Sequence, residues 1–260
     1  MMGIIEQRKI SRREFLKSSM TATAGITTMT VLGTAAMESM ASFVERNPKQ
    51  GPLLGFSSVS PNLQPMIDGI TVPEGYTARV LVSWGDSING EPDWDTVSAM
   101  DEGTQLHCYG AHTDGMHFFP WPGQAGNQRG LLVSNSEYCD PPLVNNISPA
   151  SDYAKVPITL EMVRAQQAAH GVNIILIERK RNKWSLSRNW YFNRRITGNT
   201  PCAISGPAAG HEFMKTAADA TGKNVLGTLN NCAHGYTPWG TYLTCEENWN
   251  GYFSNESGDV

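Results

Sequence analysis

Three stretches concentrate the side chains that could bind a metal or transfer protons. The richest, NNCAHGYTPWGTYLTCEEN at residues 230–248, holds two cysteines, a histidine and two adjacent glutamates. A thiolate with carboxylates suits a borderline or hard trivalent metal, and carboxylates with carbonyl oxygens suit calcium. An ordinary buried hairpin and a Cys232–Cys245 disulfide are the alternatives. Because the disulfide would leave Glu246 and Glu247 as unexplained surface charges, the composition favours a metal site.

The second cluster, HCYGAHTDGMHFFPWPG at residues 107–123, contains three histidines and an aspartate: His107, His112, Asp114 and His117. The five-residue gaps between the histidines place them on neither one helix face nor one strand face. We therefore interpret them as loop histidines that form local hydrogen bonds. Asp114 precedes a glycine and could equally be a turn residue.

The third cluster, SNSEYCDPP at residues 134–142, follows an apolar run. It places Glu137 and Asp140 at the end of an expected strand, where charged groups often line a site and often simply face water. Carboxylates are rarely buried unless they are paired or bound to a metal. Glu137 is therefore a candidate metal ligand.

The elements that would position these clusters are mostly short strands. We expect strands at 76–82, 130–135 and 241–245, and a hairpin at 172–187 that turns near Arg181 and Asn182. One helix is expected at 159–170, with Thr159 as its N-cap and Gly171 ending it in the left-handed conformation. Short strands, glycine-rich turns and little helix predict an antiparallel all-β fold. The pattern alone leaves both a sandwich and a propeller open.

The first forty residues resemble an export signal. Residues 11–17, SRREFLK, match the twin-arginine consensus, and an uncharged stretch follows at 18–37. Its many Thr, Ser and Gly residues disfavour the alternative, a membrane anchor. We therefore predict a signal peptide at 1–41, an irregular proline-rich lead-in at 42–68 and one domain at 69–260. Twin-arginine substrates are exported folded, which favours a cofactor inserted beforehand.

Net charge, cysteine count and chain length further limit the kind of protein that this can be. A net charge of -4 with only 17% charged residues gives no basic face, so nucleic-acid binding is not expected. Five cysteines leave at least one unpaired within a monomer in an oxidising compartment. A propeller blade takes about 40 to 50 residues, so the chain would form at most four or five blades. We expect it to be the N-terminal portion of a longer protein.

Several segments resemble the signature segments of PhoX-type alkaline phosphatases. They are NRRITGNTP (193–201), ISGPAAGHEFMKT (204–216) and GTLNNCAHGYTPWGTYLTCEENWNGYF (227–253), with HTDGMHFFPW and GLLVSNSEY upstream. The resemblance covers about residue 70 to the end. It implies a β-propeller, six-bladed in the family and incomplete here, with ferric iron and calcium at its centre. It also implies hydrolysis of phosphate monoesters by a metal-bound oxo or hydroxide, so no protein side chain is expected as the catalytic nucleophile.

The resemblance also assigns roles to individual residues. It implies four metal ligands: Cys232, Glu247, Glu246 and Glu137. Arg194 and Arg195 are candidates for phosphate contact because a guanidinium binds phosphate with two parallel hydrogen bonds, although a solvated basic strand edge is the alternative. The family's NHEY reads NSEY at 135–138, so a role for that histidine is not expected here. The family's CAGG reads CAHG at 232–235, which either marks a subgroup or makes His234 a candidate substrate contact.

These inferences predict a periplasmic or secreted monomer without a membrane anchor, exported by the twin-arginine translocase and acting on small phosphorylated substrates. Two rivals are a calcium-dependent propeller lactonase, which needs no thiolate, and a non-catalytic secreted metal-binding propeller. We expect little activity from this 260-residue chain alone.

Overall fold

The computed structural model describes residues 58–60, 69–123, 125–188 and 191–252. The predicted signal peptide and most of the lead-in lie outside these residues. The chain divides into two units, Met1–Ala78 and Arg79–Val260. The described part of the first unit, 58–60 and 69–78, contains only irregular backbone and one turn, in which the Tyr76 amide donates to the Pro73 carbonyl. All elements below belong to the second unit.

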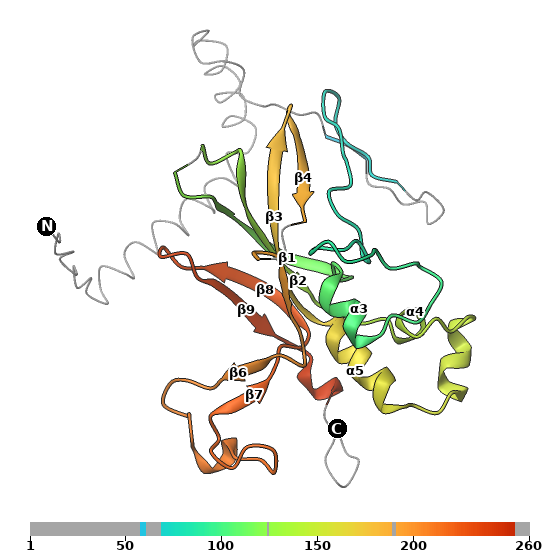
Figure 1. Ribbon diagram of the computed structural model, residues 1–260, viewed down its shortest axis with the longest axis vertical. Helices are drawn as coiled ribbons and strands as arrows, with labels where there is room; N and C mark the ends of the chain where they lie inside the picture. The colour runs from blue at the N-terminus through green and yellow to red at the C-terminus, as the bar shows by residue number, and fades with distance from the viewer. Residues whose placement is uncertain (1–57, 61–68, 124, 189–190, 253–260) are drawn as a thin grey trace, which may run out of the picture. The chain divides into compact units, whose positions relative to one another are not determined.

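An antiparallel sheet forms the centre of this unit (Figure 1). Strands β1, β2 and β3 pair in that order, and β4 and β5 pair with opposite halves of β3. Their bounds are Thr113–Pro120, Arg129–Ser136, Gly171–Lys180, Lys183–Ser187 and Arg194–Ile196. Burial along β3 is nearly continuous, and Ile175 and Leu176 are fully buried. A strand buried on both faces is expected to be a nearly continuous apolar run, and in the buried part of this one only Asn173 is polar.

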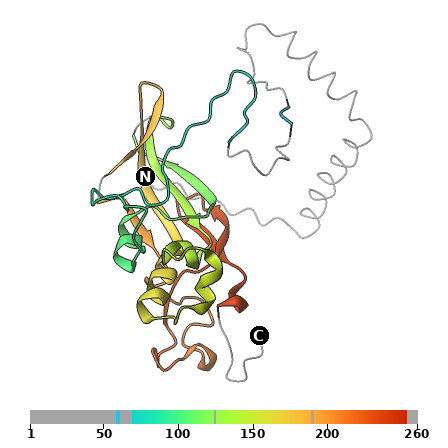
Figure 2. The ribbon, with the colours of Figure 1, turned by 90° about the vertical axis from the view of Figure 1, so that its right-hand side faces the viewer.

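Helices gather beside one end of this sheet (Figure 2). Helix α3 (Glu102–His107) precedes β1, and α4 (Pro141–Val144), the 3-10 helix η1 (Ala150–Lys155) and α5 (Leu160–Ala169) lie between β2 and β3. Helix α5 begins as predicted, because the Thr159 hydroxyl accepts from the Met162 amide. Gly171 has a φ of 121° and begins β3, where a side chain would collide with the Ile196 carbonyl.

Two hairpins complete the unit: β6 (Pro201–Ala203) with β7 (Asn224–Leu226), and β8 (Asn231–Tyr236) with β9 (Tyr242–Glu246). Two 3-10 helices, η2 (Glu212–Met214) and η3 (Trp249–Gly251), follow β6 and β9. Strand β8 packs against β1 and β2 (Figure 1). This contact joins residues near 232 to residues near 114.

Most of the predicted elements are present. The strand at 130–135, the hairpin at 172–187, the helix at 159–170 and the strand at 241–245 are confirmed within a residue or two. The turn residues Arg181 and Asn182 both have positive φ, at 50° and 61°, as tight hairpins require. The predicted strand at 76–82 is wrong: the segment is mostly exposed and has no strand assignment. Alternating β-branched residues form a strand only where a neighbouring strand pairs with them.

The described architecture is therefore mostly antiparallel sheet with little helix, and it contains no closed barrel. Within the described residues, none of the helices has the length and apolar character needed to cross a membrane.

Candidate metal centre

Two carboxylates and a thiol meet where β1, β2 and β8 come together, and we call these three residues the cluster. Asp114 lies in β1, Glu137 directly follows β2, and Cys232 lies in β8. One potential ligand atom of each lies within 4.8 Å of the others, and all three residues are half-buried. The Cys232 thiol donates to Asp114 Oδ2 over 2.9 Å. The structure thus places two of the predicted ligands, Glu137 and Cys232, beside Asp114.

Irregularities in two strands place these side chains. The register of β1 against β2 shifts between Thr113 and Met116, and that of β8 against β9 shifts between Asn231 and His234. Asp114 and Cys232 each lie inside one of these shifts. A β-bulge redirects a side chain out of the regular alternation and is common beside functional sites. Two such irregularities that face one another account for the meeting of a thiol and a carboxylate.

Gly115 allows β1 and β8 to approach this closely. A Cβ atom at this position would lie 2.8 Å from the Cys232 carbonyl oxygen and 2.8 Å from His234 Nδ1. Any side chain would push the two strands apart, and Asp114 with them. Gly115, whose sequence context also suits a turn, is therefore a close-approach position between strands.

Negative charge accumulates at this cluster. Burial raises the pKa of Glu137, and the nearby carboxylates of Asp114 and Glu247 raise it further. The hydrogen bond to Asp114 raises the pKa of the Cys232 thiol to about 12, with added effects of burial and of the charges of Asp114, Glu137 and Glu247. Glu247 thus acts electrostatically on two members of the cluster, although it is exposed itself.

The donor set fits a metal cation. Carboxylate oxygens are the ligands of hard cations, and a thiolate adds affinity for transition metals. A cation would remove the repulsion that raises the pKa values of Glu137 and Cys232, and it would displace the thiol proton. The pKa shifts and the chemistry of the donor atoms thus both favour a metal cation at this cluster.

Glu246 and Glu247 separate at the end of β9, as the alternation of strand side chains leads one to expect. The Glu246 carboxylate accepts hydrogen bonds from the Thr228 hydroxyl at 2.8 Å and from the Leu229 amide at 2.9 Å. These bonds hold the segment before β8. Glu246, predicted to be a ligand, is thus not among the three residues that the structure brings together, and its Oε1 binds the segment before β8.

Arg195 also differs from its predicted role, because it is buried and binds backbone. Its guanidinium donates to five carbonyl oxygens, those of Gln105, Cys108, Ala168, Ala169 and His170. Burial lowers the pKa of Arg195 to about 10, so it stays charged at neutral pH. Arg195 joins α3, α5 and β5, and it does not present a cation to a substrate.

The two remaining substrate candidates are exposed. Arg194 lines a largely apolar cavity of about 580 Å³ whose lining includes none of the three clustered ligand residues. His234 follows Cys232 by two residues, and its ring stacks on that of Tyr242 with centroids 5.8 Å apart. Of the two, only His234 lies beside the acidic cluster.

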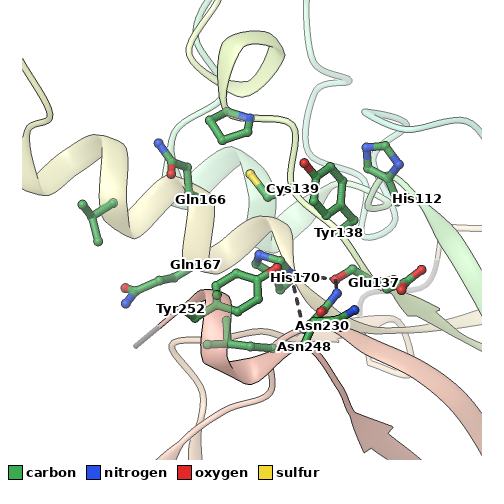
Figure 3. Close-up of a pocket in the computed structure, with 14 residues that line it drawn as sticks. His112, Glu137, Tyr138, Cys139, Gln166, Gln167, His170, Asn230, Asn248 and Tyr252 are labelled. Carbon is green, nitrogen blue, oxygen red and sulfur yellow. Dashed lines mark hydrogen bonds between the residues drawn. The ribbon is translucent and has the colours of Figure 1, made fainter. Parts of the chain in front are cut away.

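A cavity of about 850 Å³ borders the cluster on the other side of Glu137 (Figure 3). His170 Nδ1 and Asn230 Nδ2 both contact the Glu137 carbonyl oxygen, at 2.8 and 3.2 Å. Figure 3 shows the Glu137 carboxylate pointing away from His170. Burial lowers the pKa of His170. The cavity residues thus fix the main chain of Glu137 while its carboxylate remains free for the cluster.

The three histidines of the segment 107–123 make local contacts. His107 ends α3 and contacts the Gly103 carbonyl, while His112 and His117 contact the rings of Tyr138 and Tyr236. All five cysteines are free, so the alternative of a Cys232–Cys245 disulfide is not supported. Cys245 is exposed.

Comparisons with known proteins identify the family of the chain. Residues 54–260 match the family model described as alkaline phosphatase PhoX. The chain belongs to the PhoX family. It is similar to a solved structure from Pseudomonas fluorescens, PhoX in complex with vanadate, a transition state analogue, with 42% identity and a TM-score of 0.65. The similarity covers 72% of this chain and 31% of that PhoX chain, so the chain spans about a third of its relative. None of the curated proteins compared with the chain matches it.

Proposed function

We propose that this protein is a metal-dependent alkaline phosphatase that hydrolyses small phosphate monoesters outside the cytoplasm. The observation that carries the proposal is the meeting of the Cys232 thiol with the carboxylates of Asp114 and Glu137 within 4.8 Å, in a chain of the PhoX family. Because the chain spans 31% of the solved PhoX, the activity is proposed for the whole protein. The vanadate bound by that relative mimics the transition state of phosphoryl transfer, which supports a phosphate ester as the substrate.

The residues proposed to hold the metals are Asp114, Glu137, Cys232 and Glu247. We propose ferric iron and calcium as the ions, since a thiolate suits iron and oxygen donors suit both. Bound there, the ions would polarise the phosphoryl oxygens and lower the pKa of water. The chain's own residues contribute position and charge: Asp114 orients the thiol, and the hydrogen bonds of His170 and Asn230 fix the main chain of Glu137. His234, beside the cluster and exposed, is the proposed substrate contact.

Two further parts of the proposal rest on other observations. The sheet β1–β2–β3–β4 is a sequential antiparallel order of four strands, as in a propeller blade, and supports the propeller fold. The twin-arginine match at 11–17 supports export by the translocase to the periplasm or medium.

Elemental analysis and two hydrolysis assays test the proposal. Purified whole protein should contain iron and calcium and release inorganic phosphate from p-nitrophenyl phosphate, and a calcium chelator should reduce the rate. Lactone hydrolysis without phosphate release would instead identify the calcium-dependent lactonase. Absence of both metals and of both activities would favour a binding protein.

A further inference from the structure

A buried amide, Asn135, lies at the centre of a polar network behind the metal cluster. Its side chain is fully buried, two residues before Glu137 and at the end of β2. Its Nδ2 donates to the carbonyl oxygen of Cys232 over 2.8 Å and reaches that of Ala233 at 3.4 Å. The amide therefore ties β2 to the irregular part of β8 that carries the thiol.

The other atom of this amide is also occupied. Asn135 Oδ1 accepts from the hydroxyls of Tyr242 and Thr244, each at 3.0 Å. The Tyr242 hydroxyl also lies 2.9 Å from the carbonyl oxygen of Gly115, the residue after Asp114. Burial raises the pKa of Tyr242 to about 12, so this hydroxyl keeps its proton and donates.

These bonds connect the three segments that carry the cluster. Asn135 belongs to the segment of Glu137, and its Nδ2 binds the carbonyl of Cys232. The Tyr242 hydroxyl lies within hydrogen-bond distance of both Asn135 Oδ1 and the Gly115 carbonyl beside Asp114, and its one proton is donated to one of these two oxygens at a time. Both bulged segments lack regular ladder hydrogen bonds at this point, so side chains must replace them. Asn135 Nδ2 has the Cys232 carbonyl as its partner, and Oδ1 has the Thr244 hydroxyl whichever oxygen receives the Tyr242 proton, so the buried amide is held in one orientation.

We propose that Asn135, supported by Tyr242, is a positioning residue that sets the distance between the Cys232 thiol and the carboxylates of Asp114 and Glu137. The inference rests on the proposed function only in that the cluster binds a cation. Residues that orient metal ligands through hydrogen bonds typically change metal affinity by about 10- to 100-fold when they are replaced. Asn135 touches no substrate, so it acts through the ligands.

The test uses Co²⁺ alone as the probe, because a cobalt–thiolate bond gives an intense near-ultraviolet charge-transfer band. Wild-type protein should bind Co²⁺ and show this band, and Cys232→Ser should lose the band. Asn135→Ala should bind Co²⁺ about 10- to 100-fold more weakly, with a weakened or shifted band. Tyr242→Phe removes one hydroxyl only and should weaken binding in the same direction.

Asn193→Ala is the matched control. Asn193 is also a buried amide that binds backbone, at Leu176, Ile88 and Ser187, but none of its partners belongs to the cluster. It should lower thermal stability and leave the Co²⁺ dissociation constant and the band unchanged.

The outcomes separate the two proposals. Absence of Co²⁺ binding by the wild-type protein contradicts the metal site itself. A wild-type band with unchanged affinity in Asn135→Ala, or an equal loss in Asn193→Ala, overturns the positioning role alone. If Asn135→Ala does not fold, Tyr242→Phe decides, and an unchanged dissociation constant and band overturn the inference.

Discussion

Replacing Asp114 with asparagine separates the electrostatic from the structural role of the cluster. Asparagine has the same shape, and its Oδ1 can still accept the hydrogen bond from the Cys232 thiol. Only the charge is removed. In the metal-free protein the change relieves repulsion between Asp114 and Glu137, and in the metal-loaded protein it removes a ligand. The two states should therefore respond with opposite signs.

The size of the first effect follows from the geometry. Two unit charges 4.8 Å apart repel by about 3.5 kcal/mol at an effective dielectric constant of about 20 and by about 0.9 kcal/mol in bulk water. Both carboxylates are half-buried, so solvent screening favours the lower figure. Asp114→Asn should stabilise the metal-free protein by about 1 kcal/mol, which raises the Tm by about 2 to 4 °C for a chain of this size.

The effect of Asp114→Asn on the metal-loaded protein follows from mass action. A metal at about 100 times its dissociation constant stabilises the wild-type protein by about 2.7 kcal/mol. Asp114→Asn should lose most of this gain. Thermal unfolding of both proteins, with a chelator and with added metal, measures both effects. Asp152→Asn is a control, because its exposed pair with Lys155 contributes little.

A lower Tm of Asp114→Asn in the presence of chelator would show that the cluster is not under repulsion without metal. An undiminished metal-induced rise in Tm would show that Asp114 is not a ligand. Either result refutes this account of the cluster.

Four further outcomes are expected. Cys232→Ser should lose bound iron and phosphatase activity while its circular dichroism is unchanged, whereas Cys245→Ser, at an exposed free thiol, should retain both. Gly115→Ala should destabilise the protein by about 1 to 3 kcal/mol in chemical denaturation, since its Cβ would lie 2.8 Å from a backbone oxygen; an unchanged midpoint would contradict the close approach. Arg195→Leu should lower the free energy of unfolding by at least about 3 kcal/mol, because buried carbonyls lose their hydrogen-bond donor. Arg194→Leu should change it by less than about 0.5 kcal/mol. Equal effects of the two substitutions would contradict the structural role of Arg195. Metal affinity should rise with pH, because a Cys232 thiol whose pKa is about 12 must release its proton to bind; Co²⁺ titrations at several pH values measure the slope, and a flat profile would argue against thiolate coordination.

The local pattern of the sequence was enough to predict most of the elements near the site. Burial on both faces of β3 leaves a run that is apolar except for Asn173, and Thr159 is a favourable helix N-cap, so both elements are visible without a structure. The strand predicted at 76–82 failed because local propensity does not reveal whether a pairing partner exists.

The composition of the site was only partly predictable. Glu137 and Cys232 were named as ligands, whereas Asp114 could be either a cluster member or a turn residue, because its role depends on a strand irregularity that no residue type announces. Arg195 was misread since a guanidinium that binds backbone carbonyls has the same sequence appearance as one that binds phosphate. Asn135 gave no signal of its role, because its partners lie 97 or more residues away.

The 118 residues that separate Cys232 from Asp114 have a consequence for when a metal can enter. The unfolded chain offers scattered carboxylates and a thiol, and the donor set exists only after β8 has docked on β1. If the cluster binds a metal as proposed, ion selection would happen in the compartment where the chain folds. Under the proposed twin-arginine route that compartment is the cytoplasm, so the metal pool of the producing cell, and not that of the surrounding medium, would decide which ion the exported protein carries.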